Sequence, residues 1–201
     1  MVVDEIRNSG GDALAVKVDC SDDGEVGLLG IHPWMHRGIE ALVLNHGTYD
    51  RVPAQEMEMD HLRHTMKANF EGAVNVWKVI QPYLAPRANM VVVSSQLATR
   101  GSAHGADYAA SKAALSTWAR SLALAVGPEG KRVNVLAPGY VDTDILAGDS
   151  DEKRNQRIQE VPLKRIGTGD DMASIVSFLL SDDAAYITGS VLHANGGLYL
   201  P

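Results

Sequence analysis

The sequence predicts an α/β fold, in which helices cover both faces of a mainly parallel sheet. Short apolar segments bounded by turn residues alternate along the chain with longer segments whose apolar residues recur at helical spacing. The apolar segments show no polar alternation, which is typical of parallel strands buried on both faces. The chain has 201 residues, of which 45% are hydrophobic and 21% charged. We therefore expect one globular domain over residues 1–201.

The first elements lie before residue 90. Residues 2–8 predict the end of a helix that stops at a pair of glycines, and residues 13–18 predict a buried strand. A cap-like Ser-Asp-Asp follows, but the glycines after it predict a poor helix. Residues 41–44 predict a second strand, and residues 60 to about 84 predict one long helix.

The second half of the chain continues the alternation. The sequence predicts strands at residues 89–95, 132–136 and 190–193, and helices at residues 108–126, 151–160 and 170–180. Ligands of parallel sheets bind beyond the carboxyl ends of the strands. The polar or turn residues that follow the strands are therefore the first candidates for a site, namely Asp19, Asn45, Ser95 and Pro138-Gly139.

Four polar residues can carry chemistry. Tyr108 and Lys112 are four residues apart in a predicted helix and share one face. A lysine ammonium beside a phenol favours the phenolate and lowers its pKa, which suits a proton-transferring group. Ser95 ends a strand 13 residues earlier and can hydrogen-bond a substrate oxygen, although such a serine is also a common turn residue. Asn69 lies inside the long helix, where a capping or exposed amide is the alternative.

Together these residues form a familiar pattern. From Asp19 to Gly197 the chain resembles the short-chain dehydrogenase/reductase family. The segments that carry the resemblance are LNHG (44–47), KANF (67–70), VVVSS (91–95), YAASK (108–112), VNVLAPGYVDT (133–143), PLKRIG (162–167) and YITGSVLHANGG (186–197). LNHG departs from the family's Asn-Asn-Ala-Gly at two positions, and Asn195 stands where the family usually has Asp.

The resemblance implies a doubly wound, Rossmann-like parallel sheet in three α/β/α layers, and hydride transfer between NAD(P)(H) and a carbonyl or alcohol. It places the chain near the family's 3-oxoacyl-thioester reductases or sugar/polyol dehydrogenases. Tyr108 would be the general acid or base, Lys112 would lower its pKa, Ser95 would orient the carbonyl and Asn69 would hold a proton-relaying water. The implied cofactor contacts are Asp19, Cys20, Asn45, Gly47, Tyr108, Lys112, Pro138, Gly139, Val141 and Thr143.

The resemblance is incomplete at the amino terminus. The family's Gly-rich turn after a first strand is missing, and residues 1–11 correspond to the helix before the third family strand. We therefore expect an N-terminally incomplete sheet without its first two strands and first helix. The segment that distinguishes NAD from NADP is also missing, so the cofactor choice stays open. Either more chain lies upstream, or residues 13–18 pair with residues 41–44, or a partner chain fills the gap.

Because the Gly-rich turn is missing, a second function stays open. In it the chain is a non-catalytic relative that acts as an oligomerisation or regulatory subunit. The resemblance implies a homodimer or homotetramer, in which apolar stripes around Phe70, Trp77 and Trp118 would pair between chains. Packing within the chain requires the same stripes.

Composition excludes several other classes. The net charge of −7 argues against a nucleic-acid surface, and no apolar run approaches the ~20 residues of a membrane span. The single cysteine, Cys20, excludes an internal disulfide and suits a reducing compartment such as the cytoplasm. Two histidine pairs, at residues 32 and 36 and at residues 61 and 64, have metal-ligand spacing but no third ligand, so we expect no metal.

Overall fold

The sheet has four parallel strands in the order of the chain. The computed structural model describes residues 2–201. The strands are β1 (Ile39–Leu44), β2 (Leu84–Val93), β3 (Arg132–Pro138) and β4 (Val191–Ala194), and neighbouring strands pair in parallel. The central strands β2 and β3 are the most apolar, and Val91, Val92 and Val135 are fully buried. Strands without polar alternation are thus covered on both faces.

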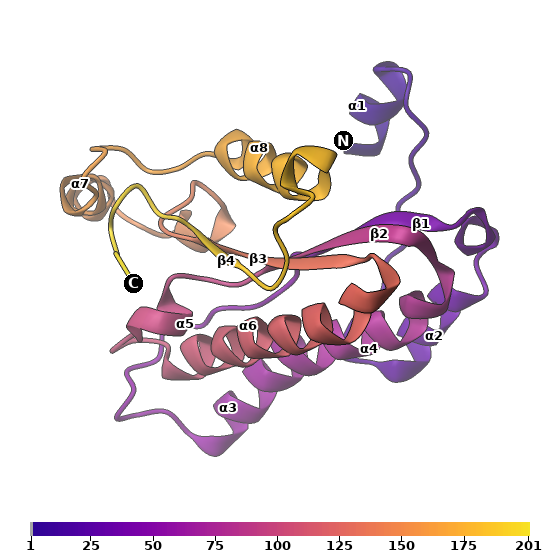
Figure 1. Cartoon of the computed structure of the whole chain (residues 1–201). Helices are drawn as coiled ribbons and strands as arrows, with labels where there is room; N and C mark the ends of the chain where they lie inside the picture. Colours follow the sequence, from indigo (N-terminus) through magenta and orange to yellow (C-terminus); the bar gives the residue numbers. More distant parts are fainter. Residues whose placement is uncertain (1) are drawn as a thin grey trace.

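One face of the sheet is covered by the helices that follow β1 and β2 (Figure 1). These are α3 (Met59–Met66), α4 (Gly72–Ile80) and α6 (Ala106–Val126), with α2 (Asp23–Gly30) packed on α4. The main core lies between them and the sheet. Phe70, Trp77 and Trp118 pack edge to face within this core, with ring centroids 6.4 Å apart in each pair. The aromatic stripes therefore have partners inside the chain.

The opposite face carries α8 (Gly169–Leu180), which packs on β2 and β3 through Leu179, Val91 and Leu136 (Figure 1). A capping box between Thr168 and Asp171 begins this helix. The exposed helix α7 (Asp151–Glu160) precedes α8. Helices on both faces confirm the predicted three-layer α/β/α fold.

The predicted long helix at residues 60–84 is wrong in detail. It is built from α3, a π-helical turn η2 (Lys67–Glu71), α4 and a 3-10 turn η3 (Gln81–Tyr83), and β2 begins directly afterwards. A π-turn inserts an extra residue per turn and often marks a functional position. The change of helix type could not be read from apolar spacing, because the spacing on either side of η2 remains helical.

The predicted strand at residues 13–18 is also wrong. After α1 (Val2–Asn8), which confirms the predicted first helix, the chain turns at Gly10 in the left-handed region and continues without strand pairing. Leu14 is 45% exposed and Val16 50% exposed. Direct pairing with β1 does not occur, so along residues 2–201 the outer edge of β1 has no strand neighbour. A strand forms only where a neighbour accepts its peptide hydrogen bonds.

The remaining elements connect the layers. Helix α2 forms despite its glycines, because the Asp22 carboxylate accepts from the Glu25 amide and caps it. Short elements complete the chain, namely η1 (Pro33–Arg37), α5 (Leu97–Arg100), η4 (Gly127–Glu129), η5 (Asp144–Leu146) and η6 (Asp182–Ala184). None of the helices within residues 2–201 has the length and apolar character that a membrane crossing requires.

Candidate active site

A cavity of about 450 Å³ lies beyond the carboxyl ends of the strands. The loops that follow β1, β2 and β3 line it, together with the first two turns of α6 and one side of α8. Three of the four predicted catalytic residues, Ser95, Tyr108 and Lys112, face this cavity. The fourth, Asn69, lies directly behind it on the π-turn and is fully buried. The fold thus brings together the four predicted catalytic residues from three segments of the chain.

Asn69 connects the π-turn to the loop after β1. Its Oδ1 accepts from the Thr48 amide at 2.7 Å, and its Nδ2 donates to the Thr48 carbonyl at 2.9 Å and to Ser111 Oγ at 3.0 Å. The amide is therefore a structural link between three elements. A side chain on Gly47 would lie 3.1 Å from both Asn69 Oδ1 and Lys112 Nζ, so only glycine fits this loop without displacing them.

Lys112 is buried, with 3% of its surface exposed, and its Nζ donates to the Val93 carbonyl at 3.0 Å. Burial disfavours the charged ammonium and lowers the Lys112 pKa to about 8. Nζ lies 5.7 Å from the centre of the Tyr108 ring, one helical turn earlier on α6. The predicted shared face is therefore present, and the lysine is held beside the phenol by the end of β2.

Tyr108 differs from the expectation in its acidity. Burial raises its pKa to about 12, the neighbouring Tyr49 acts in the same direction, and the hydrogen bond with Ser95 acts in the opposite one. The lowering that the tyrosine–lysine spacing predicts is therefore not found, because desolvation of the phenol outweighs the hydrogen bond with Ser95. The phenol is in its neutral form around pH 7, which is the form that can donate a proton.

Ser95 takes its position from the turn between β2 and α5. Its Oγ accepts from the Leu97 amide at 3.2 Å, and the residue is 8% exposed. The neighbouring Ser94 donates to the Lys112 carbonyl at 2.8 Å and thereby ties the end of β2 to α6. These contacts hold the serine hydroxyl and the phenol on one wall of the cavity.

The predicted cofactor contacts divide into two groups. Asn45, Gly47, Pro138, Gly139, Val141 and Thr143 line the cavity beside Tyr108 and Lys112. Asp19 and Cys20 lie outside it: the Asp19 carboxylate accepts from the Ser21 amide at 2.8 Å, and the Cys20 carbonyl accepts from Asn75 Nδ2 on α4 at 3.3 Å. Their role in cofactor binding stays a prediction.

The donor set fits the nicotinamide and ribose end of a dinucleotide. It offers an amide at Asn45, a phenol at Tyr108, an amine at Lys112 and the close-packed loop at Pro138-Gly139. A side chain on Gly139 would lie 2.7 Å from Asn195, so this loop passes unusually close to the turn after β4. Residues 2–201 supply no Gly-rich turn between a first strand and helix to hold a pyrophosphate.

Several residues of the site were not found from the sequence. Tyr49 lies on Tyr108, with ring centroids 4.5 Å apart, and its hydroxyl donates to the His104 carbonyl at 2.6 Å. Arg51 and Arg157 also line the cavity. Nothing in the local pattern marks these residues, because the contacts join segments far apart in the chain.

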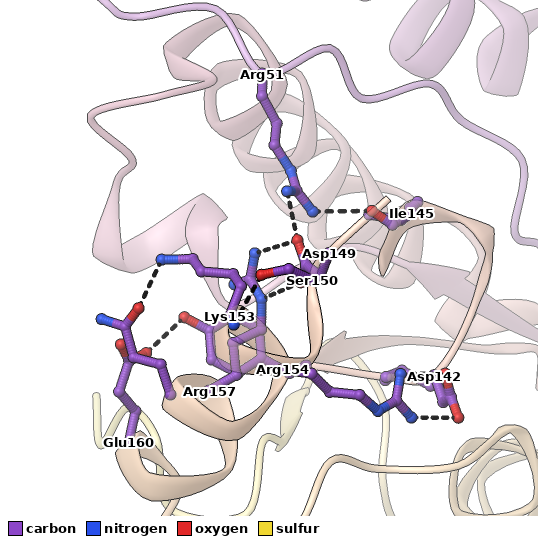
Figure 2. A network of polar contacts seen from close by, with 12 residues as sticks. Arg51, Asp142, Ile145, Asp149, Ser150, Lys153, Arg154, Arg157 and Glu160 are labelled. Atoms are coloured by element: carbon purple, nitrogen blue, oxygen red, sulfur yellow. Dashed lines mark hydrogen bonds and ion pairs between the residues drawn. The ribbon is translucent and has the colours of Figure 1, made fainter. Parts of the chain in front are cut away.

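The two arginines share one carboxylate (Figure 2). Arg51 Nη1 lies 2.6 Å from Asp149 Oδ1, and Arg157 Nε lies 2.5 Å from Asp149 Oδ2. The Asp149 side chain is 2% exposed, and the hydrogen bonds from Arg157 and then Arg51 lower its pKa to about 2. Helix α7 is thus tied to the loop after β1 across the mouth of the cavity.

The predicted histidine pairs lie outside the cavity. No group of three or more metal-ligating side chains occurs within residues 2–201. His32 Nδ1 accepts from the Trp34 amide at 3.2 Å, and His36 packs against the Tyr83 ring. Both histidines of this pair therefore have local structural contacts.

Comparisons with known proteins agree with the geometry. A family model described as enoyl-(acyl carrier protein) reductase matches residues 1–199. The chain is 35% identical to 3-oxoacyl-(acyl-carrier-protein) reductase FabG of Salmonella typhimurium, over 81% of this chain and 67% of that protein. It is 34% identical to FabG of Staphylococcus aureus, over 99% of this chain and 82% of that protein.

A solved structure is similar over almost the whole chain. This is a short-chain dehydrogenase/reductase from Brucella melitensis, described as a glucose/ribitol dehydrogenase, with a TM-score of 0.90 and 29% identity. The match covers 98% of this chain and 82% of the Brucella chain. The four-stranded sheet and its flanking helices are therefore shared with that enzyme.

Proposed function

Because the chain belongs to the short-chain dehydrogenase/reductase family, we propose that it transfers a hydride between NAD(P)(H) and a carbonyl or alcohol, with Tyr108 as the general acid or base. The substrate that fits best is a 3-oxoacyl thioester or a related ketone, since the FabG relatives are named for that reaction. The observation that carries the proposal is the meeting of Ser95, Tyr108 and Lys112 in one cavity beyond the strand ends.

The residues act in sequence on the carbonyl oxygen. The Ser95 hydroxyl holds that oxygen, and the Tyr108 phenol donates its proton to it in the reduction direction. The cofactor, when bound, supplies the hydride that the protein itself cannot supply. Loss of the proton leaves a phenolate, and the adjacent Lys112 ammonium stabilises it. Oxidation of an alcohol reverses the proton path.

Asn69 and Gly47 support this proton path. Asn69 holds the loop after β1 through its two hydrogen bonds to Thr48. Gly47 of that loop is adjacent to both the Asn69 amide and the Lys112 amine. A water molecule held there would pass a proton from solvent to Lys112 and restore the phenol. The raised pKa of Tyr108 keeps the phenol protonated and ready to donate. The lowered pKa of Lys112 lets the lysine release and take up a proton near neutral pH.

Replacing Tyr108 by phenylalanine tests the proposal. The substitution removes one oxygen atom and should reduce turnover by about 10²–10⁴-fold, as measured by oxidation of NADH or NADPH with acetoacetyl thioesters. The matched control is Tyr186→Phe, because Tyr186 is fully exposed and lies outside the cavity. Full activity in Tyr108→Phe would contradict the assignment of the acid.

A second function, that of a non-catalytic subunit, is supported by the unpaired outer edge of β1. Such an edge invites strand addition from another chain. Titration of the protein with NADH and NADPH separates the two functions. Micromolar binding of either favours the enzyme and identifies the cofactor. Absence of binding at millimolar concentration favours the subunit.

The proposal also includes the cellular compartment and the oligomeric state of the protein. We place the protein in the cytoplasm, as one domain that forms a homodimer or homotetramer and acts on a small molecule. The single cysteine and the net charge of −7 support a reducing, aqueous compartment. Light scattering of the purified chain tests the assembly.

A further inference from the structure

A second cavity, of about 650 Å³, adjoins the candidate active site. The two cavities share a wall made of Tyr49, Arg51, Leu97, Tyr140 and Arg157. Tyr49 stands at their junction, with its ring against that of Tyr108. A substrate whose carbonyl lies at Tyr108 can therefore extend past Tyr49 into the second cavity.

The second cavity is lined by positive charges. Arg51, Arg100, Lys153 and Arg157 all face it, and none of its described lining residues is acidic. The chain as a whole carries a net charge of −7. A concentration of arginine and lysine on one hollow therefore departs from the average surface and favours an anion.

Of the four cations, Arg51 and Arg157 are paired with a carboxylate, whereas Arg100 and Lys153 are available to bind an anion. Arg51 and Arg157 are fixed from behind by Asp149, and the Arg157 guanidinium lies 4.5 Å from the centre of the Tyr140 ring (Figure 2). The other nearby carboxylate, Glu160, accepts from Tyr140 Oη at 2.9 Å. Arg100 makes no ion pair with any part of the described chain, and Lys153 Nζ donates only to the Gln156 amide oxygen at 3.0 Å.

We infer that this second cavity binds an anionic group, a carboxylate or a phosphate ester, that the substrate carries at the end remote from its carbonyl. The inference rests on the proposed function, because it takes the carbonyl to lie at Tyr108. Guanidinium groups match the planar oxygen pairs of carboxylates and phosphates, and Arg51 and Arg157, already held by Asp149, lose little further freedom when an anion binds. Arg100 and Lys153 are the residues that bind the anionic group of the substrate and so distinguish charged from neutral substrates.

Matched pairs of ketones test this inference by calorimetry and by kinetics. Levulinate and its methyl ester differ in one carboxylate charge. Acetoacetyl-phosphopantetheine and acetoacetyl-pantetheine differ in one phosphate. We expect the charged member of at least one pair to bind about tenfold more tightly. The carboxylate pair and the phosphate pair distinguish the two sources of the anion.

Arg100→Gln and Lys153→Gln should each remove most of this preference while leaving the neutral member unchanged. The control Arg63→Gln makes the same change in net charge at an exposed position on α3, outside both cavities. Retention of the preference in Arg63→Gln, with its loss in the other two variants, supports the inference. Equal binding of charged and neutral members by the wild type, or equal losses in all three variants, overturns it.

The direct binding measurement separates this inference from the proposed function. Anion-dependent binding without reduction of any ketone would refute the reductase and leave the anion site standing. Reduction of both members of each pair at equal kcat/KM, with equal affinity, would leave the reductase standing and overturn the anion site.

Discussion

The Asn69 side chain is bonded to the Thr48 backbone at both of its polar atoms, with Oδ1 at 2.7 Å from the amide nitrogen and Nδ2 at 2.9 Å from the carbonyl oxygen. The amide thus completes the backbone hydrogen bonds of a loop, as a neighbouring strand would. Asn69 is fully buried, so water cannot replace these bonds. The residue that the family resemblance places in proton relay is therefore also a structural support.

Replacing Asn69 by leucine should destabilise the fold. The variant leaves the Thr48 amide and carbonyl without partners, which costs about 2–4 kcal/mol in the free energy of unfolding. Urea denaturation measures this loss. The control Asn75→Leu removes one longer bond, from Nδ2 to the Cys20 carbonyl at 3.3 Å, on a half-buried residue and should cost less. Equal losses in the two variants would refute the special role of Asn69.

Alanine at Gly47 should impair turnover more than folding. The new methyl group would lie 3.1 Å from both Lys112 Nζ and Asn69 Oδ1, so these two groups must shift slightly to make room for it. We expect kcat to fall by about a few-fold, because catalysis depends on the placement of the lysine beside the phenol. Gly27→Ala is the control, since nothing lies within 4 Å of its added methyl group. That variant should be slightly more stable and fully active. Wild-type kcat in Gly47→Ala would contradict the prediction.

The buried Lys112 predicts a rise of stability in mildly alkaline solution. Its pKa is about 8 in the folded chain against an ordinary value of 10.5, so the unfolded chain binds more protons between these values. The free energy of unfolding should therefore increase as the pH rises from 8 to 10.5. At ~1.4 kcal/mol per pKa unit, the gain is about 3 kcal/mol at most. Tyr108 acts in the opposite direction above pH 10, because its pKa is raised to about 12.

Lys112→Met isolates the contribution of the lysine. Denaturation midpoints measured across this pH range should rise in the wild type and stay closer to constant in the variant. Parallel pH profiles for the two proteins would show that Lys112 does not titrate in the predicted interval. The comparison between variants removes the contributions of the other lysines and tyrosines, which both proteins share.

Asp149→Asn should loosen the attachment of α7. The Asp149 carboxylate is nearly inaccessible and joins Arg51 to Arg157, and removal of one partner from a buried ion pair costs about 3 kcal/mol. Asp142→Asn is the matched control, because the side chains of the Asp142–Arg154 pair are 55% and 39% exposed, so water and salt screen this pair and its loss should cost much less. Chemical denaturation at neutral pH compares the two variants.

Acid should remove the difference between Asp149→Asn and the wild type. The Asp149 pKa is lowered from 3.8 to about 2, so its contribution is complete above pH 4 and is lost as the pH falls through this interval. A difference in stability that persists unchanged at pH 2 would show that the carboxylate charge is not its source.

The sequence predicted the central part of this molecule because local patterns determine it. Continuous apolar runs identify the strands at residues 89–95 and 132–136, and the spacing of Tyr108 and Lys112 places them on one helical face. The comparisons confirm the family and the class of reaction, whereas the individual roles of these residues remain predictions.

Other features could not be predicted because they depend on distant contacts. The apolar run at residues 13–18 has the composition of a strand but no strand beside it to pair with. The raised Tyr108 pKa follows from burial, which one tyrosine–lysine spacing cannot reveal. Arg51 and Asp149 are 98 residues apart, so their pairing appears only once the loops are folded around the cavity.

The outer edge of β1 has no strand partner within residues 2–201, so its peptide groups favour self-association of this chain. Exposed strand edges serve as templates on which further molecules add, and Val43 on this strand is 41% exposed. Turbidity should therefore grow with storage time in concentrated samples and decline after dilution. A charged substitution such as Ala41→Lys, at an exposed position of β1 outside the cavity, should keep the protein dispersed, because charged residues protect strand edges in natural proteins.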